Sequence, residues 1–231
     1  MNTKKCLLLS HVWITENQDY KKDIIDFSVD HFRKHNPDLY LILTGHGKRP
    51  HKDTLTKCDH VDWVDFDIKE LGKGHPKTVL SGLQHAKEKG FKKVLKQRAD
   101  CVIADSNVHE MYDNILKGKR FLAKHDPTGI HDLLMYGELE IFLSGWRTGL
   151  WDPNTDGVRN FTNTLDSKYM ADLLITDERT LKWVYLDPYW EQINSNQLKQ
   201  QILNNDFPYQ NYLWGSRSSL RAQSWEGINR A

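Results

Sequence analysis

The sequence predicts a single α/β domain in which a mostly parallel central sheet is flanked by helices. Short apolar runs rich in strand-forming residues alternate with segments of helical spacing along the chain. The 231 residues suffice for one large domain with a sizeable core. No repeat or low-complexity segment interrupts the alternation, so one domain is expected.

The first β-α-β unit is predicted from residues 6–43. The apolar run at 6–14 ends in a polar loop and indicates a central parallel strand. Residues 20–35 have apolar side chains at helical spacing, stop before Pro37 and lead to a strand at 39–43. The glycines that follow this strand lack the third glycine and helix start of the dinucleotide fingerprint, which excludes a Rossmann dehydrogenase.

The next segment predicts a basic turn-like loop at 48–57, a short strand at 60–67 and a helix with Pro76 in its first turn. The helix start superficially resembles a phosphate loop. However, Pro76 stands where the Walker pattern requires a glycine before Lys77, which excludes a P-loop NTPase. Lys77 and the positive helix end could face a diphosphate, and a solvated first-turn lysine is the alternative.

The central strand is predicted at residues 94–103 and has charges at every second position. Lys96, Arg98 and Asp100 should project from one face, since strand side chains alternate. One interpretation is an internal ion pair of Asp100 with Arg98 or Lys96, or a charged edge strand. We favour the other, that charges converging near a strand's carboxyl end mark a functional site.

The later elements are predicted from shorter patterns, and the long weakly patterned stretch is a candidate mobile lid or acceptor loop. In chain order they are a helix at 108–116, a strand at 120–124, an apolar run with carboxylates at 130–142, the candidate lid at 145–163, a helix at 169–175, a strand at 181–186, a helix at 195–203 and a packed tail from 206.

Composition limits the partners. Lys and Arg number 32 against 31 Asp and Glu, so no overall field favours nucleic acid or an anionic membrane. The three widely spaced cysteines show no zinc spacing and suit reduced thiols in the cytoplasm. Ser10 and His11 interrupt the first apolar run too early for a signal peptide or an integral membrane segment, so a soluble protein is expected.

Residues 77–86, with Ser81-Gly82-Leu83, followed by the strand that ends in Arg98-Ala99-Asp100, resemble WavE-like glycosyltransferases of lipopolysaccharide and surface-polysaccharide synthesis. The similarity continues through 130–137 to Trp146. It implies a single GT-A-like (Rossmann-like) domain over 1–231, with a nucleotide-sugar-binding half at 1–125 and an acceptor-side half at 126–231. The implied activity transfers sugar from a nucleotide-sugar donor to a glycan or glycolipid acceptor.

The resemblance also implies the donor-side residues. In such enzymes the last Asp of an Asp-x-Asp motif approaches the donor diphosphate through a divalent cation, Mn²⁺ or Mg²⁺, which makes Asp100 the implied metal ligand. Arg98 replaces the first Asp, so one oxygen ligand is lost and a fixed cation is gained. The remaining donor-side candidates act through charge, hydroxyl groups or, by fold analogy, a nucleotide-side wall. They are Lys77, Ser81, Lys96 and Arg98, and for the wall Ser10, His11, Thr44 and Gly45.

On the acceptor side, Asp132 is the implied catalytic carboxylate, because the family carries an Asp shortly before an aromatic-Gly pair like Tyr136-Gly137. Glu138 and Glu140 compete with it. If residues 133–142 are helical, the two glutamates lie about 200° apart around the axis. Asp132 would then stand at the helix start, where it could equally be a cap.

Two alternatives stay open. A sugar nucleotidyltransferase can share the architecture but normally has a Gly-rich loop bearing Arg and Lys after its first strand, and residues 11–19 lack that loop. A degenerate GT-A domain that binds glycans without turnover is favoured by the missing first Asp of the motif.

Overall fold

The structure is a computed structural model of the 231-residue chain. It describes residues 5–65, 74–103, 108–116, 118–126, 129–148, 168–169, 173–176, 183–187, 190–191 and 198–204.

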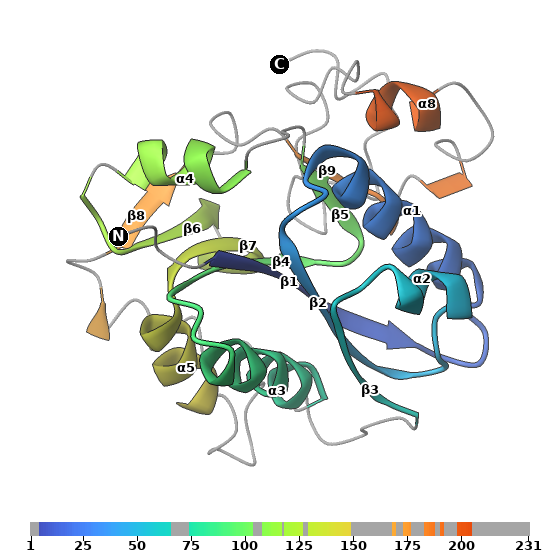
Figure 1. Ribbon diagram of the computed structural model, residues 1–231, viewed down its shortest axis with the longest axis horizontal. Helices are drawn as coiled ribbons and strands as arrows, with labels where there is room; N and C mark the ends of the chain where they lie inside the picture. The colour runs from blue at the N-terminus through green and yellow to red at the C-terminus, as the bar shows by residue number, and fades with distance from the viewer. Residues whose placement is uncertain are drawn as a thin grey trace.

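A seven-stranded sheet runs through the described part of the chain, with strand order β3-β2-β1-β4-β7-β6-β8 (Figure 1). Only β7 runs against the other six strands, because both of its pairings, with β4 and with β6, are antiparallel. The strands are β1 (Lys5–Ile14), β2 (Tyr40–Gly47), β3 (His60–Val64), β4 (Lys93–Arg98), β6 (Phe121–Asp126), β7 (Gly129–Glu138) and β8 (Leu173–Thr176). The prediction of a mostly parallel central sheet is therefore confirmed.

Helices cover both faces of the sheet. On one side lie α1 (Tyr20–His35), α2 (Lys52–Thr56) and α4 (Val108–Leu116), and on the other α3 (Gly74–Glu88) and α5 (Leu139–Thr148) (Figure 1). The short α8 (Leu198–Leu203) lies against the end of α1, where the His35 ring is 2.9 Å from the Leu203 carbonyl. Both faces of a parallel strand are buried in such an arrangement, which explains the continuous apolar run of β1.

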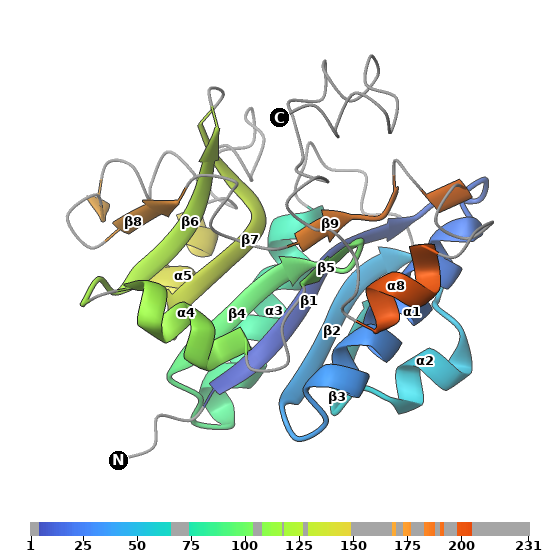
Figure 2. The same ribbon diagram turned by 90° about the horizontal axis from the view of Figure 1, so that it is seen from above.

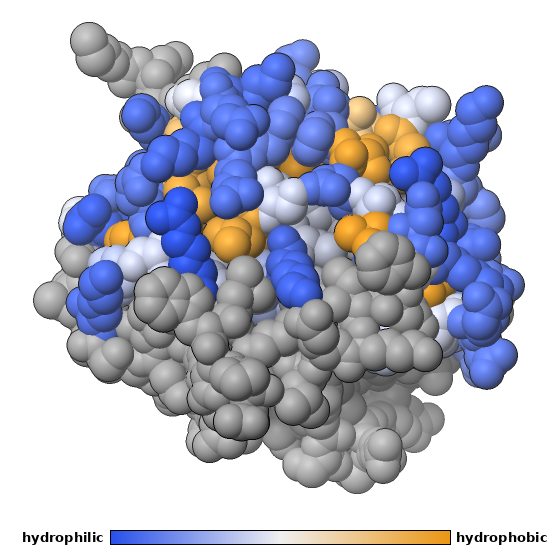
Figure 3. All heavy atoms as spheres, turned by 90° about the horizontal axis from the view of Figure 1, so that it is seen from below, coloured by the Kyte–Doolittle hydropathy of each residue, from blue (hydrophilic) through white to orange (hydrophobic). Residues whose placement is uncertain are grey.

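Each face has its own apolar core. The face under α1 and α4 includes Ile25, Leu95 and Tyr112, while the face under α3 and α5 includes Val79 and Phe142. From below, hydrophilic side chains surround smaller apolar patches on the described surface (Figure 3). The apolar sides of the helices thus face the sheet, as their helical spacing predicts.

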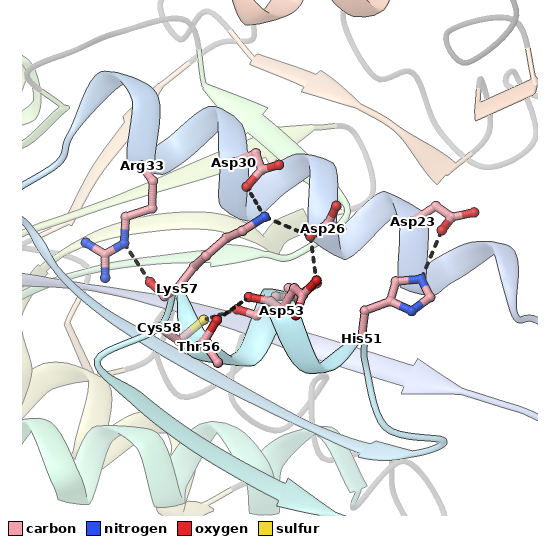
Figure 4. Close-up of polar contacts among 10 residues, drawn as sticks. Asp23, Asp26, Asp30, Arg33, His51, Asp53, Thr56, Lys57 and Cys58 are labelled. Carbon is pink, nitrogen blue, oxygen red and sulfur yellow. Dashed lines mark hydrogen bonds and ion pairs between the residues drawn. The ribbon is translucent and has the colours of Figure 1, made fainter.

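Polar contacts fasten α2 to α1 (Figure 4). Asp26 accepts a hydrogen bond of 2.7 Å from the Thr54 hydroxyl, and Lys57 reaches Asp26 at 3.2 Å and Asp30 at 2.5 Å. The two aspartates lie four residues apart on α1, so both face α2. Residues 48–57 were expected to form only a loop, since these contacts join residues about thirty positions apart and leave no local pattern.

The predicted continuous strand at 94–103 is wrong. The chain turns at Ala99 and Asp100, and β5 (Cys101–Ile103) leaves the main sheet to pair with β9 (Trp183–Tyr185). Figure 2 shows this second, two-stranded sheet beside the ends of β1 and β4. Two main-chain hydrogen bonds hold the turn, from Ala99 N to Ser10 O at 2.9 Å and from Leu186 N to Asp100 O at 2.7 Å.

Other predictions differ in detail. The proposed helix at 169–175 is contradicted at its end, where Leu173–Thr176 form β8, and a helix over 133–142 is contradicted by β7, which ends at Glu138. Residues 145–148 of the predicted lid belong to α5, while 149–163, Ser195 and the predicted tail lie outside the described residues. None of the described helices has the length and apolar composition needed to cross a membrane. The three cysteines are free thiols.

Candidate functional site

The sheet has a topological switch point between β1 and β4. The connection through α1 carries the chain from β1 to β2 on one side, whereas α3 carries it from β3 back to β4 on the other. In open α/β sheets ligands bind in the crevice outside the carboxyl ends of the strands at such a point. The ends of β1 and β4 and the start of α1 therefore define the candidate site.

Arg98 and Asp100 form a bidentate ion pair at this edge. Arg98 Nε donates to Asp100 Oδ1 at 2.9 Å, and Nη2 donates to Oδ2 at 2.6 Å. Their side chains are 10% and 14% exposed, so the pair is shielded from solvent but still reaches the surface. The predicted internal ion pair is confirmed, and it lies at the carboxyl edge where the functional interpretation also placed these charges.

Three further residues surround the pair and were missed by sequence reasoning. Tyr20 and Lys21 begin α1, and Asp187 follows β9. Lys21 Nζ lies 4.0 Å from Asp187 Oδ2, and the Tyr20 hydroxyl is a neighbour of the same carboxylate. A tyrosine and a lysine directly after the β1 loop, and a carboxylate directly after a predicted strand, were the available signals.

Electrostatics couple these groups. Burial raises the pKa of the Asp187 carboxyl and the charge of Asp100 adds to this rise, while Lys21, Tyr20 and Arg98 oppose it. Burial, followed by the two carboxylates, raises the pKa of Tyr20 to about 12. A tyrosine in this environment keeps its proton and does not ionise near neutral pH.

Lys96 does not join this group. Its side chain is fully buried, and Nζ lies 5.2 Å from the centroid of the Trp146 ring on α5. Strand alternation directs it to the face beneath α5, two residues inside the edge that Arg98 occupies. The ammonium is thus buried and not presented at the carboxyl edge, and a role of Lys96 in orienting the donor stays a prediction.

The predicted nucleotide-side wall also lies deeper than expected. β1 and β2 continue to Ile14 and Gly47, so Ser10, Thr44 and Gly45 are buried inside strands. His11 lies in β1 with a side chain outside the described residues.

Trp13 is an exposed aromatic residue at this edge. Its ring is 48% exposed and stacks on the buried His46 ring, with centroids 5.8 Å apart. Trp13 lies directly opposite His46 in the pairing of β1 with β2, so the two neighbouring strands together present an aromatic surface at the carboxyl edge.

The α3 candidates have separate roles. Lys77 is exposed in the first turn, whereas the Ser81 hydroxyl hydrogen-bonds Asp62 on the edge strand β3. Ser81 therefore fastens α3 to the sheet. Lys77 stays a prediction as a donor contact.

Two of the acceptor-side candidates, Asp132 and Glu138, lie in different parts of β7. This strand is antiparallel to β4, with Leu134 opposite Gln97 and Glu138 opposite Lys93. Asp132 therefore comes from the end of β7 beside the carboxyl end of β4, inside a strand and not at a helix start, and its side chain lies outside the described residues.

Glu138 lies at the opposite edge of the sheet, where Arg120 Nη2 donates to it at 2.6 Å. The prediction that Glu138 shares the site is corrected by this register. Glu140 is exposed on α5 near Lys87, 3.6 Å away.

The described residues do not fit a divalent cation at Asp100. Such ions require several oxygen ligands, yet both Asp100 oxygens accept hydrogen bonds from Arg98. No group of three or more His, Cys, Asp or Glu side chains arranged for metal binding exists in the part of the chain that the structure describes. The divalent cation implied by the resemblance stays a prediction, and no step below depends on one.

Neither a family model nor a curated protein matches the sequence. Solved structures of a similar fold exist. One is a cytidylyltransferase from Leptospira borgpetersenii, with 13% identity, 90% of this chain and 91% of the other covered, and a TM-score of 0.53. A second is a nucleoside-diphosphate-sugar pyrophosphorylase from Vibrio cholerae, with 10% identity, coverage of 82% and 100%, and a TM-score of 0.54. A third is a glycosyltransferase involved in the glycosylation of the major capsid of PBCV-1, with 11% identity, coverage of 97% and 98%, and a TM-score of 0.50.

The chain therefore has the α/β fold of nucleotide-sugar transferases and nucleotidyltransferases. At these identities the likeness shows the fold alone. The narrower resemblance to WavE-like enzymes stays a prediction.

Proposed function

We propose that the protein is a glycosyltransferase that moves a sugar from a nucleotide-sugar donor to a glycan or glycolipid acceptor. One observation carries the proposal: the Arg98–Asp100 pair lies at the switch point between β1 and β4, beside Lys21 at the start of α1. This edge combines cations with a helix N-terminus, which is the combination that a leaving diphosphate requires. The resemblance in sequence adds a role in surface-polysaccharide synthesis in the cytoplasm.

Each requirement of the reaction has a residue. The acceptor hydroxyl oxygen attacks the anomeric carbon, and the bond from that carbon to the diphosphate oxygen breaks. Arg98, oriented by Asp100, stabilises the charge that develops on the diphosphate. Trp13 supplies an exposed ring on which the nucleotide base can stack. The proton of the acceptor hydroxyl passes to Asp132, which belongs to β7, the antiparallel neighbour of β4.

A sugar nucleotidyltransferase is the second candidate. The similar solved structures include a cytidylyltransferase and a pyrophosphorylase, with TM-scores as high as that of any glycosyltransferase among them. That reaction joins a sugar phosphate to a nucleoside triphosphate and releases pyrophosphate, so its phosphate groups also need cations at the switch point.

The two reactions are separated by their products. Purified protein is incubated with a panel of nucleotide sugars, and release of nucleoside diphosphate is measured with and without glycan acceptors. A parallel assay supplies sugar 1-phosphates and nucleoside triphosphates and measures pyrophosphate. We expect diphosphate release that Asp100→Asn lowers by about 10²-fold and Lys22→Gln leaves intact, since the described ion-pair partner of Lys22 is Asp19.

Pyrophosphate formation without diphosphate release would support the nucleotidyltransferase. A folded protein that binds glycans and is inactive in both assays would show the non-catalytic alternative.

A further inference from the structure

Arg98 occupies the place where the Asp-x-Asp pattern has its first carboxylate. The structure shows how this arginine affects the second carboxylate of the pattern, Asp100. Both oxygens of Asp100 accept hydrogen bonds from one guanidinium, at 2.9 and 2.6 Å. A planar guanidinium matches a carboxylate in this two-point geometry and keeps its charge at every accessible pH. The carboxylate that would attract a metal ion is therefore already neutralised by a fixed cation.

A second cation lies at the same edge. Lys21 is in the first turn of α1, and its side chain is 23% exposed. Its described carboxylate neighbour is Asp187, at 4.0 Å, and burial together with Asp100 acts against the charged form of that carboxyl. The helix N-terminus adds positive potential at the same place.

We propose that Arg98 and Lys21 bind the diphosphate of the donor directly and that this site takes no divalent cation. The inference rests on the proposed function, because it concerns the same donor. Asp100 is a positioning residue that fixes the plane of the Arg98 guanidinium, and Asp187 is the carboxylate beside the Lys21 ammonium. A diphosphate then meets two preplaced cations, whereas an Asp-x-Asp site offers two carboxylates that need a metal ion between them and the phosphates.

The binding of UDP, CDP, GDP, ADP and dTDP tests this by titration calorimetry, with the full-length protein in EDTA or in MnCl₂. The wild type should bind one of these probes in EDTA, with an affinity that Mn²⁺ changes by less than about threefold. Arg98→Ala should weaken binding at least about tenfold in both buffers, because it removes one member of a charge pair. Lys21→Gln should weaken binding severalfold, while the neighbouring Lys22→Gln serves as the matched control and should leave it unchanged.

Arg98→Asp provides the sharpest variant. It returns the second carboxylate of the pattern and removes the fixed cation, so binding should fail in EDTA and recover at least about tenfold in Mn²⁺. If this variant does not fold, as judged by its circular dichroism spectrum, the comparison of wild-type binding in EDTA and in MnCl₂ still tests the proposal. Wild-type binding that disappears in EDTA and returns with Mn²⁺ would overturn the metal-free site and leave the proposed function standing. A folded wild type that binds no nucleoside diphosphate in either buffer would contradict both the metal-free site and the proposed function.

Discussion

At the scale of single residues, Asp100 contributes to both proposals about the site, the transfer of a sugar and the metal-free binding of the donor diphosphate. Its carboxylate holds the Arg98 guanidinium at two points, and its carbonyl accepts the hydrogen bond from Leu186 N that joins β9 to the site. Asp100→Asn keeps the size of the side chain but removes the charge. We expect turnover to fall by about 10²-fold, because Arg98 loses the two-point contact that orients it and its stabilisation of the transition state weakens.

The fold should survive this change, because the main-chain hydrogen bonds of the turn are unaffected. A melting curve and steady-state kinetics measure the two effects. The control is Asp53→Asn, an exposed carboxylate on α2. If Asp100→Asn turned over donor at the rate of that control, the ion pair would be purely structural.

Asp132 gives a second prediction at this scale. Since it lies within β7 and not at a helix start, the capping explanation no longer competes with a catalytic one. Asp132→Ala should lower turnover by about 10²-fold or more, as expected for loss of a general base, while nucleotide affinity stays at the wild-type value. Glu140→Ala, at an exposed carboxylate on α5, is the matched control. Unchanged turnover in the Asp132 variant would remove this residue from the mechanism.

Residue identities in the site were only partly predictable from the sequence. Arg98 and Asp100 were found because charges at alternate positions in an apolar strand are conspicuous. Lys96 belongs to the same pattern, yet it packs beneath Trp146. The pattern specifies a face of the strand but not whether a helix covers it. Asp187 is contributed by a segment about ninety positions from Asp100, which no local pattern connects.

At the scale of elements, α3 packs against the sheet through Gly82. A β-carbon at this position would lie 2.7 Å from Leu8 Cδ1 and 2.8 Å from Thr44 Cγ2, so these buried side chains or the helix itself would have to shift. Gly82→Ala should therefore destabilise the protein by about 1–3 kcal/mol, as overpacking usually does, despite the better helix propensity of alanine. Gln84→Ala, at an exposed position of the same helix, should be neutral or slightly stabilising.

Urea unfolding midpoints of the two variants compare these effects directly. A Gly82→Ala protein as stable as the wild type would mean that α3 has room to move outward.

Helices with strong periodicity were the predictable elements. The predicted bounds of α1 and α4, 20–35 and 108–116, match the structure. The break after Arg98 was not predictable, because the alternation of β4 continues through the turn into β5 and the hydrogen bonds that hold the turn, with Ser10 and Leu186, come from distant segments. Short apolar runs were ambiguous: Leu173–Thr176 form a strand where a helix was expected.

At the scale of the whole molecule, the carboxyl and amino edges of the sheet have different arrangements of charged residues. The carboxyl edge has the candidate site, while the amino edge is held together by Asp113 on α4. Lys5 of β1 and Lys93 of β4 each lie 2.5 Å from its carboxylate, and the Tyr136 hydroxyl of β7 donates to it at 2.7 Å. One side chain thus joins α4 to three neighbouring strands. The order of these strands, with β7 between β4 and β6, could not be predicted from the sequence, because it depends on pairings between distant segments.

This junction predicts how stability depends on pH. Burial acts to raise the pKa of Asp113, but the hydrogen bonds from Lys5, Lys93 and Tyr136 outweigh it and lower the pKa from 3.8 to about 2. A carboxyl whose pKa is lower in the folded state stabilises the fold above its unfolded pKa, and this contribution is lost as the pH falls from about 4 to about 2. A shift of this size corresponds to about 2 kcal/mol of unfolding free energy.

Asp113→Asn should therefore unfold at lower urea concentration than the wild type at pH 7, and the difference should shrink steadily below pH 4. Asp38→Asn, at an exposed carboxylate, provides the comparison at each pH. Equal stability of the Asp113 variant and the wild type at pH 7 would contradict the junction. A difference that persisted unchanged to pH 2 would assign the effect to packing and not to charge. Because Asp113 is at the edge opposite Arg98, its loss should leave nucleotide affinity intact at temperatures where the variant remains folded.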